Sequence, residues 1–276
     1  MSNIDLAPDH KTGLTLPNPV MTAAGCFGLG SEYQDLVGCD ALGAIVVGPV
    51  TARPRFGAAP PRAIPLTGGV LLDTGLANPG INATIQSYAH VWRRLSVPTI
   101  VHVAGTRPAE VESCCRQLAG IDNVHGIELG LPADVTGNEA SDLVQSAARA
   151  AYQPLLVQLP LSSGHVLCTE AVYAGAHALT VAAPPRGTAW DARGKRFITG
   201  RLYGPLVLSL ALRALRRVAE RVSVPVIGCG GVHSTEDARA FLNAGAVAIQ
   251  IGDALWRDPA CLARIAMNLA SLDPPR

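Results

Sequence analysis

The feature that most constrains the fold is the alternation of short apolar runs with segments patterned as helices. Eight apolar runs occur, at 19–24, 42–47, 99–104, 126–129, 155–159, 178–182, 224–227 and 246–251. Their β-branched residues are typical of strands buried in a parallel sheet. Helices are expected at 81–95, 108–119, 139–151, 166–175, 205–221, 235–243 and 255–270. Eight such units predict an α/β protein, a closed (β/α)8 TIM barrel rather than an open doubly wound sheet.

The remaining segments are a short N-terminal hairpin and two long excursions. Residues 4–16 are expected to form a hairpin that turns at 10–13. The excursions, 48–80 and 184–202, have too little pattern for a strand or helix of the core. Loops of this length are usually functional or covering structure, and we expect both to cover the carboxyl ends of the strands, where barrels carry their chemistry. No linker divides the chain, so residues 1–276 are expected to form a single domain.

Composition excludes several classes of function. The formal net charge of +1 does not favour binding to nucleic acid or to a membrane surface. No apolar run reaches the length of about 18 residues that spans a bilayer, and the first residues lack a signal-peptide pattern, so we expect a cytoplasmic protein. The seven cysteines are odd in number and lack paired CxxC spacing, so we expect reduced thiols and no metal site.

Two strand–glycine–helix turns lie close together in the sequence. The glycines are Gly228, Gly230, Gly231 and Gly252, and Ser234 or Thr235 is expected to cap the helix that follows the first turn. Such turns gather backbone N–H groups and helix N-termini, which suits a phosphate, and barrels commonly bind phosphate after strands seven and eight. The alternative is that these glycines simply end strands.

Several blocks of sequence carry a family resemblance. They include 24–33 (AGCFGLGSEY), 53–57 (RPRFG), 75–80 (GLANPG), 227–231 (IGCGG) and 250–252 (QIG). With these blocks the chain resembles the class 1 dihydroorotate dehydrogenases of pyrimidine biosynthesis, especially the branch that pairs with an iron–sulfur flavoprotein subunit. The resemblance implies a barrel that holds FMN with its phosphate at the two glycine turns, a homodimer and a possible protein partner. The implied cofactor positions are Ala24, Gly25, Gly48, Gln158, Gly204, Gly230, Gly231, Gly252 and Asp253.

The residues that carry the family's reaction are missing. The family moves a hydride from dihydroorotate to the flavin while a loop cysteine removes the adjacent proton. That cysteine position is Ala133, which cannot accept a proton, and two flanking asparagines fall at Gly130 and Val135. Gly48 and Gln158 stand where the family has two lysines of the flavin site.

Groups that hold the substrate are missing as well. Leu72 stands where the family has an asparagine, and Ala183 and Pro184 stand where it has an Asn-Thr pair. Each lost polar contact is worth about 1–3 kcal/mol. Several together exceed the binding energy of a micromolar ligand, about 8 kcal/mol. We therefore expect no orotate chemistry by the family mechanism.

FMN binding stays an open question at this stage. The glycine turns remain, but Asp253 stands where the family prefers threonine, and an acid beside a phosphate is unfavourable. Gln158 carries no charge to stabilise a reduced flavin. Arg201 and Tyr203 replace a small glycine–serine turn over the flavin, where they either fill the emptied space or offer a new anion contact.

Few groups could support a new reaction. His102 replaces a family asparagine and is either a base at neutral pH or a hydrogen-bonded structural histidine. Asp134 is either a carboxylate base or a solvated loop residue. Asp73 and Thr74 are expected in a solvated turn, Cys26 in packing and Glu128 in a structural role. Arg53, Arg55 and Arg62 are expected to fix the loop and to contact another subunit. No nucleophile, base and orienting group can be assembled from spacing alone.

Two hypotheses follow, and whether the chain is an enzyme stays open between them. The first is a pseudoenzyme-like paralogue that keeps the barrel and serves as a scaffold or regulatory partner. The second is an FMN-dependent oxidoreductase that acts on a different, less polar substrate. The lack of a replacement acid–base group favours the first, and the surviving glycine turns favour the second. We favour the first slightly.

Overall fold

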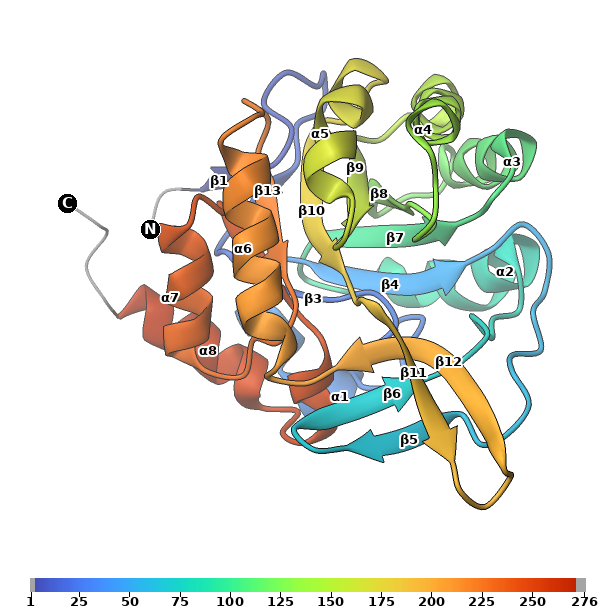
Figure 1. Cartoon of the computed structure of the whole chain (residues 1–276). Helices are drawn as coiled ribbons and strands as arrows, with labels where there is room; N and C mark the ends of the chain where they lie inside the picture. The colour runs from blue at the N-terminus through green and yellow to red at the C-terminus, as the bar shows by residue number, and fades with distance from the viewer. Residues whose placement is uncertain (1–2, 272–276) are drawn as a thin grey trace.

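A computed structural model describes residues 3–271 and contains the predicted barrel (Figure 1). Eight parallel strands follow the order β3-β14-β13-β10-β9-β8-β7-β4. The strands are β3 (Val20–Thr22), β4 (Ile45–Val50), β7 (Thr99–Ala104), β8 (Val124–Gly130), β9 (Leu155–Pro160), β10 (Ala178–Ala183), β13 (Val226–Cys229) and β14 (Ala248–Ile251). The edge strands β3 and β4 meet where the Thr22 N–H donates to the Ala44 carbonyl at 3.3 Å, which nearly closes the barrel. The predicted (β/α)8 fold is confirmed.

Helices surround the barrel in Figure 1. They are α1 (Gln34–Val37), α2 (Ile81–Trp92), α3 (Pro108–Leu118), α4 (Gly137–Ala150), α5 (Gly164–Tyr173), α6 (Val207–Ala219), α7 (Thr235–Asn243) and α8 (Cys261–Ala270), with 3-10 turns η1 (Cys39–Ala41) and η2 (Asp253–Trp256). Ser234 caps α7, because its side chain accepts from the Asp237 N–H while Asp237 accepts from the backbone of Ser234. The predicted helices are present, most with ends displaced by up to three residues. The expected start of the last helix at 255 is wrong, because the 3-10 turn η2 occupies 253–256 and α8 begins at Cys261.

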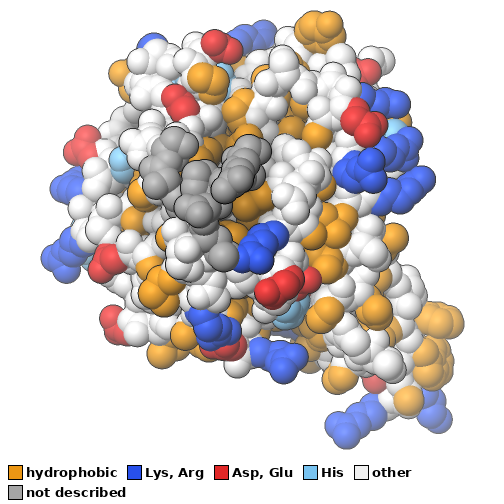
Figure 2. All heavy atoms as spheres, turned by 90° about the vertical axis from the view of Figure 1, so that its left-hand side faces the viewer, with side chains coloured by type: hydrophobic (Ala, Val, Ile, Leu, Met, Phe, Trp, Pro, Cys, Tyr) orange, Lys and Arg blue, Asp and Glu red, His pale blue; other side chains and the backbone are white. Residues whose placement is uncertain are grey.

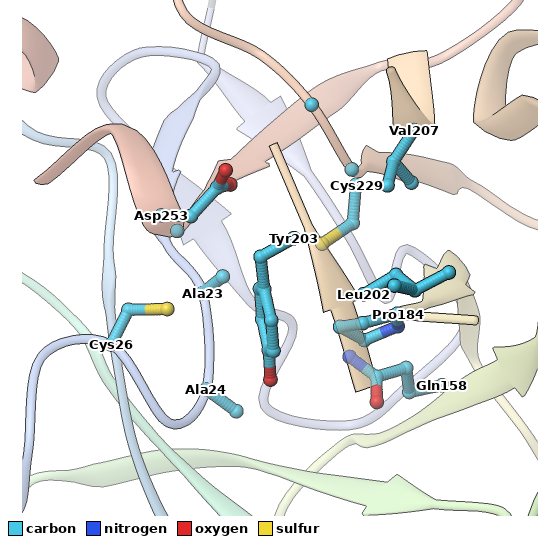
Figure 3. Close-up of a pocket in the computed structure, with 13 residues that line it drawn as sticks. Ala23, Ala24, Cys26, Gln158, Pro184, Leu202, Tyr203, Val207, Cys229 and Asp253 are labelled. Carbon is cyan, nitrogen blue, oxygen red and sulfur yellow. The ribbon is translucent and has the colours of Figure 1, made fainter. Parts of the chain in front are cut away.

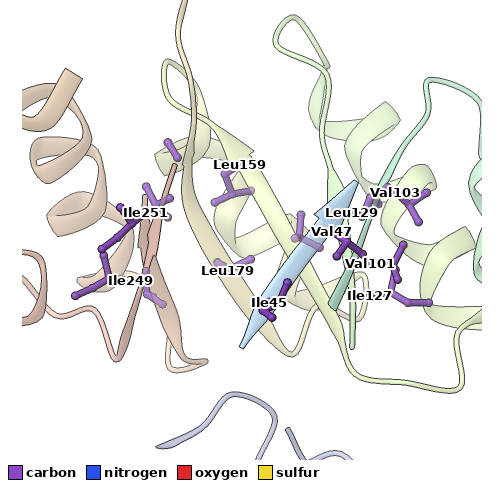
Figure 4. Close-up of a cluster of buried hydrophobic side chains, with 14 of the residues drawn as sticks. Ile45, Val47, Val101, Val103, Ile127, Leu129, Leu159, Leu179, Ile249 and Ile251 are labelled. Atoms are coloured by element: carbon purple, nitrogen blue, oxygen red, sulfur yellow. The ribbon is translucent and has the colours of Figure 1, made fainter. Parts of the chain in front are cut away.

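The two-residue alternation of the strands divides the core into two layers. Ile45, Val47 and Val101 point outward against the helices and belong to the larger buried cluster (Figure 4). Val46 and Ile100, one residue out of phase, belong to the smaller cluster inside the barrel. By the same alternation, polar residues near the carboxyl ends of the strands are directed into the barrel. The core therefore fixes which side chains can reach a site at that end.

The predicted N-terminal hairpin closes the amino end of the barrel. Its strands are β1 (Ile4–Asp5) and β2 (Thr15–Leu16), which pair antiparallel. Leu6, Leu14 and Leu16 are buried with the inner cluster. The hairpin therefore leaves the carboxyl end of the barrel as the end where a site can lie.

The expectation that 48–80 and 184–202 are irregular is wrong. They contain β5 (Ala63–Leu66), β6 (Gly69–Leu72), β11 (Arg186–Asp191) and β12 (Arg196–Tyr203), which form one antiparallel sheet in the order β11-β12-β6-β5. In Figure 1 this sheet lies apart from the barrel strands and its β11–β12 hairpin projects beyond them. The pairing of β6 with β12 joins segments about 130 residues apart, which a local pattern does not reveal. The expectation that both excursions cover the same face is confirmed, because they share this sheet.

The surface and the cysteines add two findings. Figure 2 shows hydrophobic side chains dispersed among polar ones, with basic side chains gathered toward the right of that face. Among residues 3–271, no helix is long and apolar enough to cross a membrane, and no group of three metal-ligating side chains is found. All seven cysteines are buried and unpaired, as expected for reduced thiols.

Candidate functional site

The candidate site is a small cavity at the carboxyl end of the barrel (Figure 3). Thirteen residues line it: Ala23, Ala24, Cys26, Gln158, Pro184, Leu202, Tyr203, Val207, Cys229, Gly230, Gly231, Gly252 and Asp253. Its volume is about 30 Å³, room for about two water molecules. Sites for cofactors and drug-sized ligands have volumes of about 300–1,000 Å³. Six of the cofactor positions implied by the resemblance line this cavity, which is far smaller than such sites: Ala24, Gln158, Gly230, Gly231, Gly252 and Asp253.

Tyr203 accounts for much of the filling. Its side chain projects into the middle of the lining residues in Figure 3. The backbone is held by the antiparallel register, in which Tyr203 lies opposite Val70 of β6. Its ring packs against that of Trp256 with centroids 5.2 Å apart. Burial raises the pKa of the Tyr203 hydroxyl, so the phenol stays neutral at physiological pH.

A carboxylate stands at the second glycine turn. Asp253, the first residue of η2, lies with its Oδ2 3.0 Å from Nε2 of His233. Both side chains are largely buried. His233 follows the first glycine turn, so this hydrogen-bonded contact links the two turns that the sequence predicts as a phosphate site. His233 was missed by sequence reasoning, because it has no special spacing.

The helix N-terminus at these turns is already occupied by its own chain. The backbone N–H groups of His233 and Ser234 both donate to Oδ2 of Asp237, each at 3.0 Å. The Asp237 N–H in turn donates to Oγ of Ser234 at 3.1 Å. The carboxylate of Asp237 therefore takes the positive end of α7, where an anionic ligand would otherwise bind.

The glycines of the turns have packing reasons of their own. A Cβ at Gly231 would lie 2.5 Å from the backbone nitrogen of Leu208, and one at Gly252 would lie 2.9 Å from Sγ of Cys26. Gly231 also has a φ of +72°, which disfavours any side chain. The close approach of α6 and of Cys26 thus requires these glycines without a phosphate. Close packing, without phosphate binding, is enough to account for Gly231 and Gly252.

A buried polar network lies inside the barrel beneath the mouth. Nδ1 of His102 is 2.7 Å from Oε2 of Glu128, and Thr180 and Gln250 donate to Oε1 of Glu128, each at 2.6 Å. Burial alone would raise the pKa of Glu128, but the hydrogen bonds from His102, Thr180 and Gln250 lower it overall. Glu128 is fully buried. This geometry favours the structural role for both His102 and Glu128.

The ring of His102 also fills the place of a neighbouring side chain. A Cβ at Gly130 would lie 2.5 Å from Nε2 of His102. The His102 ring and the absence of a side chain at Gly130 therefore fit each other. His102 does not line the cavity.

The remaining predicted residues divide between the cavity and its surroundings. Gly25 donates its N–H to the carbonyl of Gly48 at 2.8 Å, beside the cavity rather than in its lining. Gly48 has a φ of +109°, and a Cβ there would lie 2.8 Å from the His102 carbonyl, so the family lysine cannot stand here without movement of β4. Gly204 has a φ of +129° and turns the chain from β12 into α6.

The loop that carries the family base contains no base directed at the cavity. Neither Ala133 nor Asp134 lines the cavity. The side chain of Asp134 is 83% exposed and pairs with Nη1 of Arg186 at 3.0 Å. Arg201 donates to the Pro184 carbonyl at 2.8 Å, and burial lowers the pKa of its guanidinium. Solvation and loop pairing describe Asp134 better than a catalytic role.

The other titratable groups of the lining are thiols. Burial raises the pKa of both Cys26 and Cys229 far above the usual range of a thiol. A thiol that stays protonated is neither a nucleophile nor a base at neutral pH. The packing role expected for Cys26 is consistent with this, since its sulfur lies against Gly252.

Comparison with known proteins agrees with the fold. The family model described as "Dihydroorotate dehydrogenase" matches residues 9–272. The dihydroorotate dehydrogenase B (NAD(+)) catalytic subunit of Geotalea uraniireducens (strain Rf4) is 35% identical over 273 residues, covering 93% of this chain and 90% of the relative. The corresponding subunit of Geobacillus kaustophilus (strain HTA426) is 33% identical over 276 residues, covering 94% and 88%. The chain belongs to the dihydroorotate dehydrogenase family.

Proposed function

We propose that this chain is a dihydroorotate dehydrogenase-family barrel that does not oxidise dihydroorotate and serves as a scaffold or regulatory partner. One observation carries the proposal: Tyr203 fills the mouth of the barrel, and the loop position of the family base is Ala133, which cannot accept a proton. The titratable lining groups are Tyr203, Cys26, Cys229 and Asp253. The first three have raised pKa values, and the fourth pairs with His233.

The site does not fit the family's cofactor. FMN needs a cavity many times larger than 30 Å³. Its phosphate would meet the carboxylate of Asp253 and a helix N-terminus already taken by Asp237. We therefore derive no step through FMN. The alternative, an FMN-dependent oxidoreductase for a less polar substrate, is separated from the proposal by the experiments below.

The proposal includes assembly with other chains. The relatives are named as catalytic subunits, which implies partner subunits in those enzymes. We propose a homodimer and a protein partner in the cytoplasm for this chain by analogy. Light scattering after gel filtration tests the first point. A mass near twice 28.6 kDa is expected, and a monomer would exclude the homodimer.

The test of lost activity is turnover of dihydroorotate. The purified chain is assayed with dihydroorotate, added FMN and an artificial electron acceptor, beside a relative that keeps the loop cysteine. We expect no rate above the protein-free reaction. A rate that saturates with dihydroorotate would overturn the proposal.

A restoring variant sharpens this test. Ala133→Cys returns the family base alone, and it is expected to stay inactive, because Gly48, Gln158 and Leu72 still stand in place of the two lysines and the asparagine that the resemblance assigns to flavin and substrate. Recovery of turnover in Ala133→Cys would show that only the base is missing and that the remainder of the site is intact.

A further inference from the structure

We propose that the chain occupies its own cofactor site: the Tyr203 ring takes the place of the flavin ring, and the Asp253–His233 pair takes the place of the phosphate. FMN is then excluded rather than bound weakly. This inference rests on the proposed function only for the location of the family's cofactor at this end of the barrel. It can fail while the loss of dihydroorotate oxidation still holds.

The Tyr203 ring is positioned by a paired strand rather than by a mobile loop. The residue ends β12, and its backbone pairs with Val70 of β6. The next residue, Gly204, passes so close to Gly68 that a Cβ there would lie 2.5 Å from the Gly68 carbonyl. Trp256 of η2 packs against the ring. Two separate elements therefore hold the ring in the mouth.

The phosphate end is closed by charge and by hydrogen bonding. The Asp253 carboxylate, largely buried, pairs with Nε2 of His233 at 3.0 Å. A second anion beside it would have to break this pair or accept like-charge repulsion at low solvent exposure. The α7 N–H groups of His233 and Ser234 are directed at Asp237. Asp253 thus places a carboxylate in the lining of the cavity, and Asp237 occupies the neighbouring helix N-terminus.

The two closures use side chains from different strands and turns, so each can be altered by its own substitution. Tyr203 comes from β12, whereas Asp253 and His233 come from the turns after β14 and β13. Riboflavin, which has the ring but no phosphate, probes the first closure alone. FMN probes both closures together.

The experiment is a titration of flavin fluorescence with the full chain. Wild-type protein is expected to leave the fluorescence of riboflavin and of FMN unchanged, because the dissociation constant for each flavin is expected to exceed about 1 mM. Tyr203→Ser is expected to bind riboflavin, and Tyr203→Ser with Asp253→Thr is expected to bind FMN at about 10 µM, a gain of about 100-fold. Gel filtration with the visible spectrum then shows whether the flavin stays with the protein.

The control variant is Tyr173→Ser with Asp122→Thr, the same changes at exposed positions outside the cavity. It should behave as wild type in both titrations. Micromolar binding of FMN by wild-type protein would overturn the inference, whether or not the variants fold. Folded Tyr203→Ser and double variants that still exclude both flavins would overturn it as well, because some other feature would then close the site.

Discussion

At the scale of single residues, the barrel interior is held by one buried carboxylate. Glu128 accepts from Thr180 and Gln250 and pairs with His102. A fully buried carboxylate is costly unless its hydrogen bonds are satisfied, and here both oxygens have partners. This network spans β7, β8, β10 and β14, so it ties four strands of the barrel together.

Glu128→Gln should destabilise the protein by about 2–3 kcal/mol, because charge-assisted hydrogen bonds to a buried carboxylate are lost. Urea unfolding at pH 7 measures this. Glu112→Gln, which alters an exposed pair with Arg116, should change the free energy of unfolding by less than about 0.5 kcal/mol.

The pH dependence of this effect has a definite sign. The pKa of Glu128 in the folded protein lies below its ordinary value of 4.5, so its contribution is complete above pH 4.5 and is lost as pH falls through the folded value. The unfolding free energies of wild type and Glu128→Gln should therefore converge below pH 4.5. A constant difference down to lower pH would contradict the assignment.

The pair His102 and Gly130 gives a second test at this scale. Gly130→Asn alone should cost about 2–4 kcal/mol, because its Cβ would meet Nε2 of His102. In the double variant with His102→Asn the steric penalty should be relieved, with a coupling of about 1–3 kcal/mol in a double-mutant cycle of unfolding free energies. Additive effects would show that the two residues do not compensate for each other.

Sequence reasoning identified Glu128 and His102 one by one but not the network. Thr180 and Gln250 reach Glu128 only because the two-residue alternation of β10 and β14 turns them inward at the same height. Tyr203 was recognised as a large residue over the mouth, yet its two possible roles could not be separated. The register between β12 and β6, which decides between them, is a long-range property.

At the scale of elements, the barrel strands were predictable and the covering sheet was not. Continuous apolar runs mark β4, β7 and β9, because both faces of a barrel strand are buried. The strands of the covering sheet expose residues on at least one face, and β5 has little burial at all. Their pairing comes from contacts between distant segments, so the local sequence resembles a loop.

Gly69→Ala tests the covering sheet. A Cβ at this position would overlap the carbonyl oxygen of Tyr203, so the β6–β12 pairing must shift, at a cost of about 1–3 kcal/mol. Gly120→Ala is the matched control, since nothing lies within 4 Å of its Cβ position, and its effect should stay within about 0.5 kcal/mol. Thermal unfolding of the two variants measures the difference, and equal effects would argue against the close pairing.

At the scale of the whole molecule, the barrel is closed at both ends by its own chain. The N-terminal hairpin covers the amino end, where the ring of His10 packs edge-on against that of His177 with centroids 4.8 Å apart. The covering sheet and Tyr203 close the carboxyl end. A barrel closed in this way needs no ligand to complete its core, which agrees with a role carried by its surface.

The histidine contact at the amino end predicts acid sensitivity. Burial lowers the pKa of both His10 and His177 below the ordinary value of 6.5, so the folded state binds fewer protons than the unfolded state. The free energy of unfolding should therefore fall as pH decreases below 6.5. Urea unfolding between pH 8 and pH 5 measures this, with His177→Gln expected to reduce the slope. An unchanged slope in that variant would place the acid sensitivity elsewhere.

The central claim, that the family's cofactor site is filled by the protein itself, is tested most directly by the visible absorption spectrum of the purified full chain. The spectrum is taken after incubation with excess FMN and removal of free flavin by gel filtration. We predict a colourless protein with no flavin absorption. A yellow protein that carries FMN in equal molar amount would contradict the claim.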